Sequence, residues 1–169
     1  MKRGCKAGCA SVVIVLSVAV FGIIHSVFLN WANPNTVRLL PKKQSKTLNE
    51  LVELADGQFL RADDVAWKYR QLFFLNGLQY VDGRSEDGFV SFVFNSSNLE
   101  GNITLYYSPG GFKPVYRHLD RVLGFADRTL PDVSEAGIRI DGIGAGGKGY
   151  VFYSMISPEW YLVDLYMPT

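Results

Sequence analysis

The hydrophobic pattern begins with one long apolar run close to the N-terminus. Residues 12–29 contain no Asp, Glu, Lys or Arg, and about 20 apolar residues in a helix cross a hydrocarbon core of about 30 Å. The run is longer than the core of about 7–15 apolar residues found in signal peptides. We therefore expect a single-pass transmembrane signal anchor at residues 10–32, preceded by a cytoplasmic tail at residues 1–9. A cleaved signal peptide and a buried helix of a soluble domain are the alternatives.

Beyond residue 46 the apolar positions first recur at helical spacing and then alternate as in strands. Thr47 and Glu50 match a capping box, which predicts a helix that ends near Gly57. A second helix is expected over residues 62–76, where the apolar positions form one stripe and Asn76-Gly77 ends it. The remaining elements are a helix at residues 114–125 and strands at residues 78–81, 89–95, 102–107, 137–141, 149–156 and 160–167.

This order of elements predicts the fold class. Helix, helix, three strands, helix and three strands fit an α+β domain of two layers with a mostly antiparallel sheet. We expect that compact domain to occupy residues 47–169. Together with the N-terminal transmembrane helix it accounts for most of the chain of 169 residues.

The segment between the apolar run and the domain is basic. Residues 33–46 contain two prolines and four cations, which is typical of a linker near lipid headgroups. A solubilising stalk is the alternative. The residues expected at the membrane interface are Trp31, Arg38, Lys42, Lys43 and Lys46.

The overall charge of +1 hides an asymmetry. From residue 47 onward there are 10 Lys and Arg against 16 Asp and Glu, a net charge of −6. An acidic domain lacks the cationic surface that binds nucleic acid, so we expect no nucleic-acid partner. Both cysteines, Cys5 and Cys9, precede the apolar run, so the rest of the chain has neither a disulfide nor a thiolate zinc site. We expect no metal and no cofactor.

Charge alone leaves the orientation of the anchor nearly balanced, because cations flank the apolar run on both sides. A nine-residue tail with the three cations Lys2, Arg3 and Lys6 is unfavourable to translocate. We therefore expect the N-terminus inside and the domain on the extracytoplasmic or periplasmic side.

Several predicted strands carry large apolar side chains on both faces. Residues 89–94 and 160–167 both show this pattern, whereas a sheet with one wet face alternates more cleanly. Either loops or a helix of the same domain cover the second face, or it meets a partner or another copy of the chain. The strand residues selected as candidates for partner binding are Phe89, Trp160 and Tyr161.

A second group of candidates lies around His118, the one histidine outside the apolar run. An imidazole near Asp120 could act as a general base, but residues 118 and 120 of a helix point in different directions. Arg117 and Arg121 would share a helix face and could contact an acidic partner. A solvated surface is the alternative.

The glycine-rich segment of residues 142–149 matches two nucleotide-binding spacings. Gly142, Gly144 and Gly147 have a dinucleotide-binding spacing, and Gly142, Gly147 and Lys148 resemble a phosphate-binding loop. Both motifs require a following helix, whose N–H groups hold the phosphate. Gly149 stands where a Ser or Thr would bind magnesium, and a strand-like sequence follows. We therefore predict a hairpin or surface loop, with an anion nest around Lys148 as the alternative.

These observations favour a membrane-anchored, non-enzymatic protein-binding domain, such as an envelope accessory, an inhibitor or an immunity-type protein. Its expected partners are membrane lipid and either another protein or itself. Two alternatives remain open. One is a small enzyme that uses His118 or the glycine-rich loop, and the other is a structural membrane subunit that self-assembles.

Overall fold

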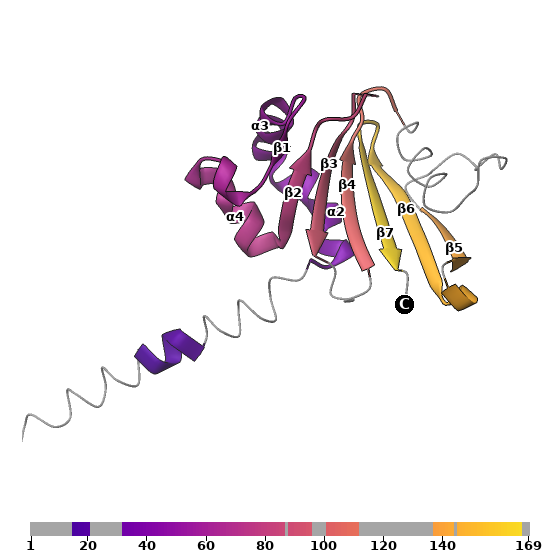
Figure 1. Cartoon of the computed structure of the whole chain (residues 1–169), viewed down its shortest axis with the longest axis horizontal. Helices are drawn as coiled ribbons and strands as arrows, with labels where there is room; N and C mark the ends of the chain where they lie inside the picture. The colour runs from indigo at the N-terminus through magenta and orange to yellow at the C-terminus, as the bar shows by residue number, and fades with distance from the viewer. Residues whose placement is uncertain are drawn as a thin grey trace, which may run out of the picture.

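The structure, a computed structural model, describes residues 15–20, 32–86, 88–95, 101–111, 137–143 and 145–166 (Figure 1). Its helices are α2 (Pro34–Lys43), α3 (Ser45–Leu54) and α4 (Trp67–Asn76), with two 3-10 turns, η2 (Ala62–Asp64) and η3 (Ala145–Gly147). Its strands are β1 (Phe59–Leu60), β2 (Leu78–Asp82), β3 (Val90–Asn95), β4 (Gly101–Tyr107), β5 (Ile138–Ile143), β6 (Gly149–Ser157) and β7 (Trp160–Tyr166).

The strands form a single seven-stranded sheet in the order β1-β2-β3-β4-β7-β6-β5. Every neighbouring pair is antiparallel. The expected α+β class with an antiparallel sheet is therefore confirmed. All six predicted strands are present, with ends shifted by no more than two residues, and the two-residue β1 is an additional edge strand.

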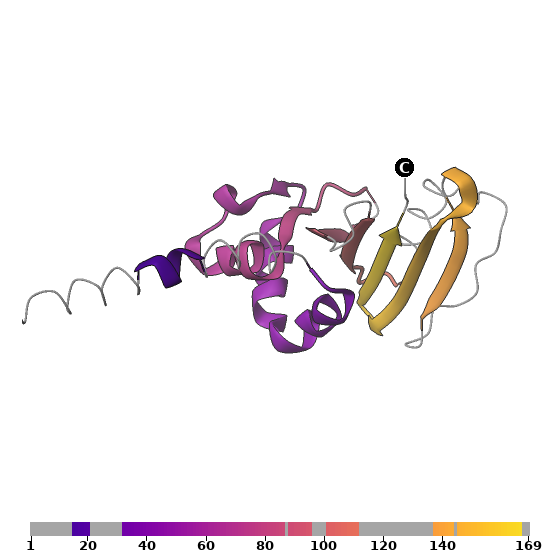
Figure 2. The same cartoon turned by 90° about the horizontal axis from the view of Figure 1, so that it is seen from below.

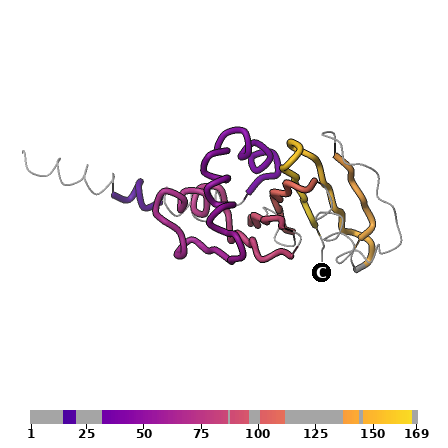
Figure 3. The backbone as a smooth tube through the Cα atoms, turned by 90° about the horizontal axis from the view of Figure 1, so that it is seen from above, coloured from indigo at the N-terminus to yellow at the C-terminus, as the bar shows by residue number. Residues whose placement is uncertain are grey.

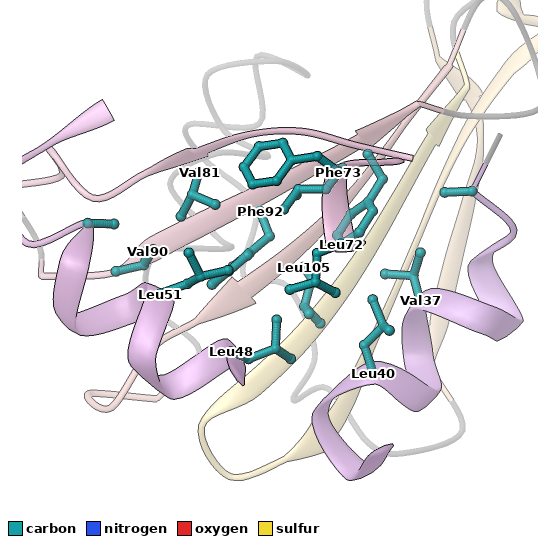
Figure 4. Close-up of a cluster of buried hydrophobic side chains, with 14 of the residues drawn as sticks. Val37, Leu40, Leu48, Leu51, Leu72, Phe73, Val81, Val90, Phe92 and Leu105 are labelled. Atoms are coloured by element: carbon teal, nitrogen blue, oxygen red, sulfur yellow. The ribbon is translucent and has the colours of Figure 1, made fainter. Parts of the chain in front are cut away.

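One face of the sheet carries the main hydrophobic core. Val81, Phe92, Leu105 and Leu162 are paired across β2, β3, β4 and β7, so their side chains share this face. The helices α2 and α3 lie on that side of the sheet (Figures 2 and 3). Figure 4 shows Val37 and Leu40 of α2 and Leu48 and Leu51 of α3 directed at the strand side chains. All of these side chains are at most 3% exposed.

The segment expected to be a linker is instead the helix α2. The Asn33 side chain accepts a hydrogen bond from the Asn35 N–H, and Pro34 occupies the first turn, where a missing N–H costs nothing. Val37, Leu40 and Pro41 are buried, at the spacing of one helix face. The folded part of the chain therefore begins before residue 47, and it includes most of the basic segment.

The two predicted helices of the domain have different boundaries from those expected. The helix α3 begins at Ser45, so Thr47 lies inside it and does not cap it. The expected helix over residues 62–76 is divided into η2 and α4, since Val65 and Ala66 are extended. Gly77 ends α4 as predicted, with a φ of 70° in the left-handed region that glycine adopts without strain.

A smaller cluster of buried side chains lies on the opposite face of the sheet. Its members are Tyr106, Ile143, Val151, Tyr153, Tyr161 and Val163. The strand register gives the reason, since Tyr106 pairs with Tyr161 and Val163 pairs with Tyr153. Both faces of β4, β6 and β7 are therefore partly apolar, and for β7 the sequence predicts this pattern.

The expected membrane anchor lies mostly outside the described residues. Residues 15–20 are helical, and Val15, Leu16, Val18 and Val20 are 51–69% exposed. Within the residues that the structure describes, no helix is both long enough and apolar enough to span a bilayer. The predicted helix at residues 114–125 also lies outside the described residues.

Candidate functional site

A groove of about 320 Å³ opens on the sheet face opposite the helices. It crosses β2, β3, β4 and β7, where Tyr80, Val93, Thr104 and Val163 are paired across adjacent strands and so share one face. We call it the sheet groove. Its described lining residues are Tyr80, Asp82, Phe89, Ser91, Val93, Asn102, Thr104, Tyr106, Val163 and Leu165.

The lining of the sheet groove combines aromatic walls with hydrogen-bonding groups. Phe89 packs edge-on against Tyr106, with 5.6 Å between the ring centroids. Thr104 and Tyr106 are 7% and 3% exposed, whereas Asn102 is exposed. Thr104 and Tyr106 therefore form the floor of the groove. The groups that a partner can contact are the half-buried Phe89 ring and the exposed Asn102 amide, and aromatic contact area beside hydrogen-bonding groups is typical of protein-recognition surfaces.

The charged group of the sheet groove is held by a fork of hydrogen bonds. Arg84 donates from Nε to Oδ1 of Asp82 and from Nη2 to Oδ2, each at 2.8 Å. The guanidinium lowers the pKa of the Asp82 carboxyl, and that carboxylate raises the pKa of Arg84. Burial raises the pKa of Tyr106 above its usual value of 10.0. All three shifts move the pKa values of these groups further from neutral pH, and this favours fixed binding groups over acid–base catalysis.

A second hollow of about 420 Å³ adjoins the sheet groove at Phe89. It lies between the end of α3 and the β2–β3 connection, and Glu53 and Asp56 contribute carboxylates to its lining. The connection approaches α3 closely at Gly83, where a Cβ would lie 1.9 Å from the Ala55 carbonyl oxygen. Only glycine fits at this position, so the close approach of the β2–β3 connection to the end of α3 depends on it.

The three strand residues that the sequence selected for partner binding differ in their exposure and in the face of the sheet on which they lie. Phe89 is half-buried and lines both the sheet groove and the adjoining hollow. Tyr161 is 4% exposed and is the cross-strand neighbour of Tyr106, and its hydroxyl donates to the Pro158 carbonyl oxygen at 2.8 Å. Trp160 lies on the helix side of the sheet, 6% exposed, where it packs against Phe92. A partner could therefore contact Phe89 but little of Trp160.

The other predicted candidates are not gathered at the sheet groove. Lys148 is exposed between η3 and β6, at the opposite end of the sheet from Phe89. Arg117, His118 and Arg121 lie outside the described residues. Within the described part of the chain, no three His, Cys, Asp or Glu side chains gather as metal ligands would.

The glycine-rich segment connects two strands, as the sequence predicts. The strand β6 begins at Gly149, so no helix follows to present N–H groups to a phosphate. Gly142, Gly146 and Gly147 have positive φ values, which explains the glycine content as turn geometry.

The residues expected at the membrane interface are distributed over two helices. Arg38 is half-buried in α2, while Lys42 and Lys43 are exposed in its last turn. Lys46 is exposed at the start of α3. Trp31 lies outside the described residues. Because α2 is ten residues long, Lys42 and Lys43 lie up to about 15 Å along the helix axis from Pro34, where α2 begins.

Sequence reasoning missed most of the sheet groove, although one signal of it was present. Asn102, Thr104 and Tyr106 alternate with apolar residues in β4, which marks a polar stripe on one face. The contributions of β2 and β3 could not be added to it without the strand register.

Comparison with known proteins adds no family to this picture. No protein-family description, no curated protein and no solved structure matches the chain.

Proposed function

We propose that the chain is a membrane-anchored, non-enzymatic binding domain that recognises another protein through the sheet groove. It would serve as an envelope accessory, an inhibitor or an immunity-type protein. The anchor would be single-pass, with the folded domain on the extracytoplasmic or periplasmic side.

The anchor is supported by the sequence and by the exposure of its described part. Residues 12–29 contain no charged side chain, and four large apolar side chains of residues 15–20 are more than half exposed. Burying such side chains in lipid is favourable by about 25 cal/mol for each Å² of apolar surface. A bilayer is therefore a suitable environment for this segment.

The observation that supports binding most directly is the lining of the sheet groove. It presents aromatic rings, hydroxyl groups, an amide and the Asp82 carboxylate, which is already paired with Arg84, on an antiparallel sheet. The adjoining hollow adds the carboxylates of Glu53 and Asp56. These features suit a protein segment that carries a basic residue next to an aromatic or aliphatic one.

Site-specific photocrosslinking of the full-length protein in its own membranes tests this proposal. A benzophenone amino acid replaces Phe89 at the sheet groove in one variant, and Leu39, which is 43% exposed on α2, in the control. We expect one dominant protein adduct from position 89 and none from position 39. We also expect the adduct from position 89 to disappear when the substitution Asn102→Trp fills the groove.

The other outcomes separate the alternatives. Equal adducts from both positions would remove the support for the sheet groove. Adducts only with a second copy of the chain would favour the self-assembling structural subunit. No adduct at either position would contradict the binding proposal and direct attention to the small-enzyme alternative, through His118 or the glycine-rich loop.

A further inference from the structure

The outer face of α4 carries large apolar side chains that the fold does not cover. Trp67 is 73% exposed, Phe74 is 49% exposed and Leu75 is 55% exposed. Trp67 and Phe74 are seven residues apart and therefore lie on the same side of the helix. The opposite side is anchored by Tyr69, Leu72 and Phe73, which are at most 7% exposed. We call Trp67, Phe74 and Leu75 the α4 outer face.

The end of α4 lies next to the point where the chain enters the fold. The Ala32 N–H donates to the Asn95 carbonyl oxygen at 2.7 Å, and the Asn95 N–H donates to the Gly77 carbonyl oxygen at 2.8 Å. Gly77 directly follows α4. Two hydrogen bonds thus connect Ala32, the first residue that the structure describes after the apolar run, to the end of the helix that carries Phe74 and Leu75. In Figure 1 this is the end of the sheet at which β3 finishes.

Very little chain separates Ala32 from the apolar run. The run extends to Leu29, and Ala32 is already 3% exposed within the main core. Three residue steps span at most about 11 Å when fully extended. The polar headgroup region on each side of a bilayer is about 5–8 Å thick. If the run spans the bilayer, the part of the domain around Ala32 and Gly77 must therefore lie at the membrane surface.

The charge of α4 also suits a lipid surface. Its ten residues include Lys68 and Arg70 and no Asp or Glu. Lys68 is paired with Glu50 of α3 at 2.8 Å, so the positive charge beside Trp67 comes from Arg70. The Arg70 guanidinium lies 5.9 Å from the centroid of the Trp67 ring. An indole with a cation beside it is a characteristic combination at the membrane–water interface.

We propose that the α4 outer face lies in the headgroup region of the bilayer that holds the N-terminal run, so that the domain rests on the membrane through α4. This inference rests on the anchor of the proposed function. It fixes the orientation of the domain, because the end of the sheet that carries Phe89 is then directed away from the lipid.

Lipid quenching of a fluorescent probe tests this orientation in the full-length chain. Cys5 and Cys9 are replaced by serine, and an environment-sensitive fluorophore is attached to Leu75→Cys. The matched control is Leu54→Cys, a leucine of similar exposure, 44%, at the far end of α3. Leu54 lies far from Gly77, because the nearby Gly57 N–H donates a hydrogen bond to the carbonyl oxygen of Gly83, which is at the opposite end of β2 from Gly77. The vesicles contain phosphatidylcholine and phosphatidylglycerol, with bromine near the headgroups in the quenching set.

We expect brominated lipid to quench the probe at position 75 several-fold more strongly than the probe at position 54. Flotation of the chain with the vesicles after an alkaline wash shows that the anchor is inserted. If the probes at positions 75 and 54 were then quenched equally, the inference would be overturned and the anchor would stand. Blue-shifted emission at position 75 without lipid quenching would also overturn it, because protein would then cover this face. A chain that the alkaline wash removes from the vesicles would contradict the anchor itself, and the inference with it.

Discussion

Among single residues, Asp164 is a carboxylate whose surroundings oppose its charge. It lies in β7 on the helix side of the sheet and is 9% exposed. The Tyr150 hydroxyl donates to its Oδ2 at 3.3 Å, and Arg139 lies 4.0 Å from the centroid of the Tyr150 ring. Burial nevertheless raises the pKa of Asp164 above its usual value of 3.8, since the hydrogen bond and the cation compensate for only part of the lost hydration.

This shift predicts a pH-dependent gain in stability from Asp164→Asn. A pKa that is higher in the folded state means that wild-type stability falls as the pH rises from about 4 through that pKa. The asparagine cannot ionise, and its amide oxygen can still accept from Tyr150. We therefore expect the free energy of unfolding of the variant, relative to wild type, to be larger at pH 7 than at pH 4. Urea unfolding in detergent at several pH values measures it.

Asp63→Asn is the matched control for this change. Asp63 is an exposed carboxylate in η2, so its substitution removes the same charge without relieving burial. A pH-dependent gain of the same size in Asp63→Asn would show that the loss of one negative charge, and not the relief of burial, causes the effect. A gain for Asp164→Asn that is independent of pH would show that the carboxylate is not penalised by burial.

Among the elements, strands were predictable from the sequence and α2 was not. Strands such as β3 and β7 are marked by aromatic and β-branched residues between clear turn signals. The helix α2 is marked by two prolines and a basic last turn, a composition typical of linkers. Its core-facing positions Val37 and Leu40 are too few to outweigh that composition locally. Packing against β4 and β7 makes the segment helical, and this contact is not encoded in any short window.

The role of α2 can be tested with two adjacent leucines. Leu40 is 3% exposed in the main core, and Leu39 is 43% exposed beside it. Leu40→Ala removes buried methyl groups and leaves a cavity, so we expect a loss of about 2–4 kcal/mol in the free energy of unfolding. Leu39→Ala keeps the helix propensity and is expected to cost less than about 0.5 kcal/mol. Urea unfolding of the full-length chain compares them, and equal small losses would mean that α2 does not belong to the core.

The candidate site was less predictable than the strands, because it depends on register. Ser91 and Thr104 lie on different strands and reach one face only because β3 pairs with β4 at Val93 and Thr104. A shift of β4 by one residue would direct Thr104 into the helix-covered core and leave Ser91 on the groove face. Of the strand residues that the sequence selected for partner binding, Phe89 is among those lining the sheet groove.

In the whole molecule, charge is distributed unevenly between the N-terminal part and the domain. The first 46 residues contain seven cations and no carboxylate, whereas the chain from residue 47 has a net charge of −6. Three of these cations precede the apolar run and four follow it. The orientation of the anchor therefore depends on the balance between two short basic segments, because long domains are translocated largely regardless of their charge.

This balance predicts opposite effects of charge removal on the two sides of the run. Neutralising Lys2, Arg3 and Lys6 with glutamine removes the signal that keeps the N-terminus inside, so we expect a mixed population with part of the domains on the cytoplasmic side. Neutralising the exposed Lys42, Lys43 and Lys46 removes the competing signal, and we expect at least the wild-type fraction of domains outside.

Protease digestion of a C-terminal tag in right-side-out vesicles measures the fraction of domains outside. The two triple variants have equal charge changes, so the total charge of the chain cannot explain a difference between them. The opposite orientation gives a different result. The wild-type tag would be protected from the protease, and only the variant with Lys42, Lys43 and Lys46 neutralised would expose it, which would mean that the domain is cytoplasmic. The protein partner of the sheet groove would then have to be sought on the cytoplasmic side.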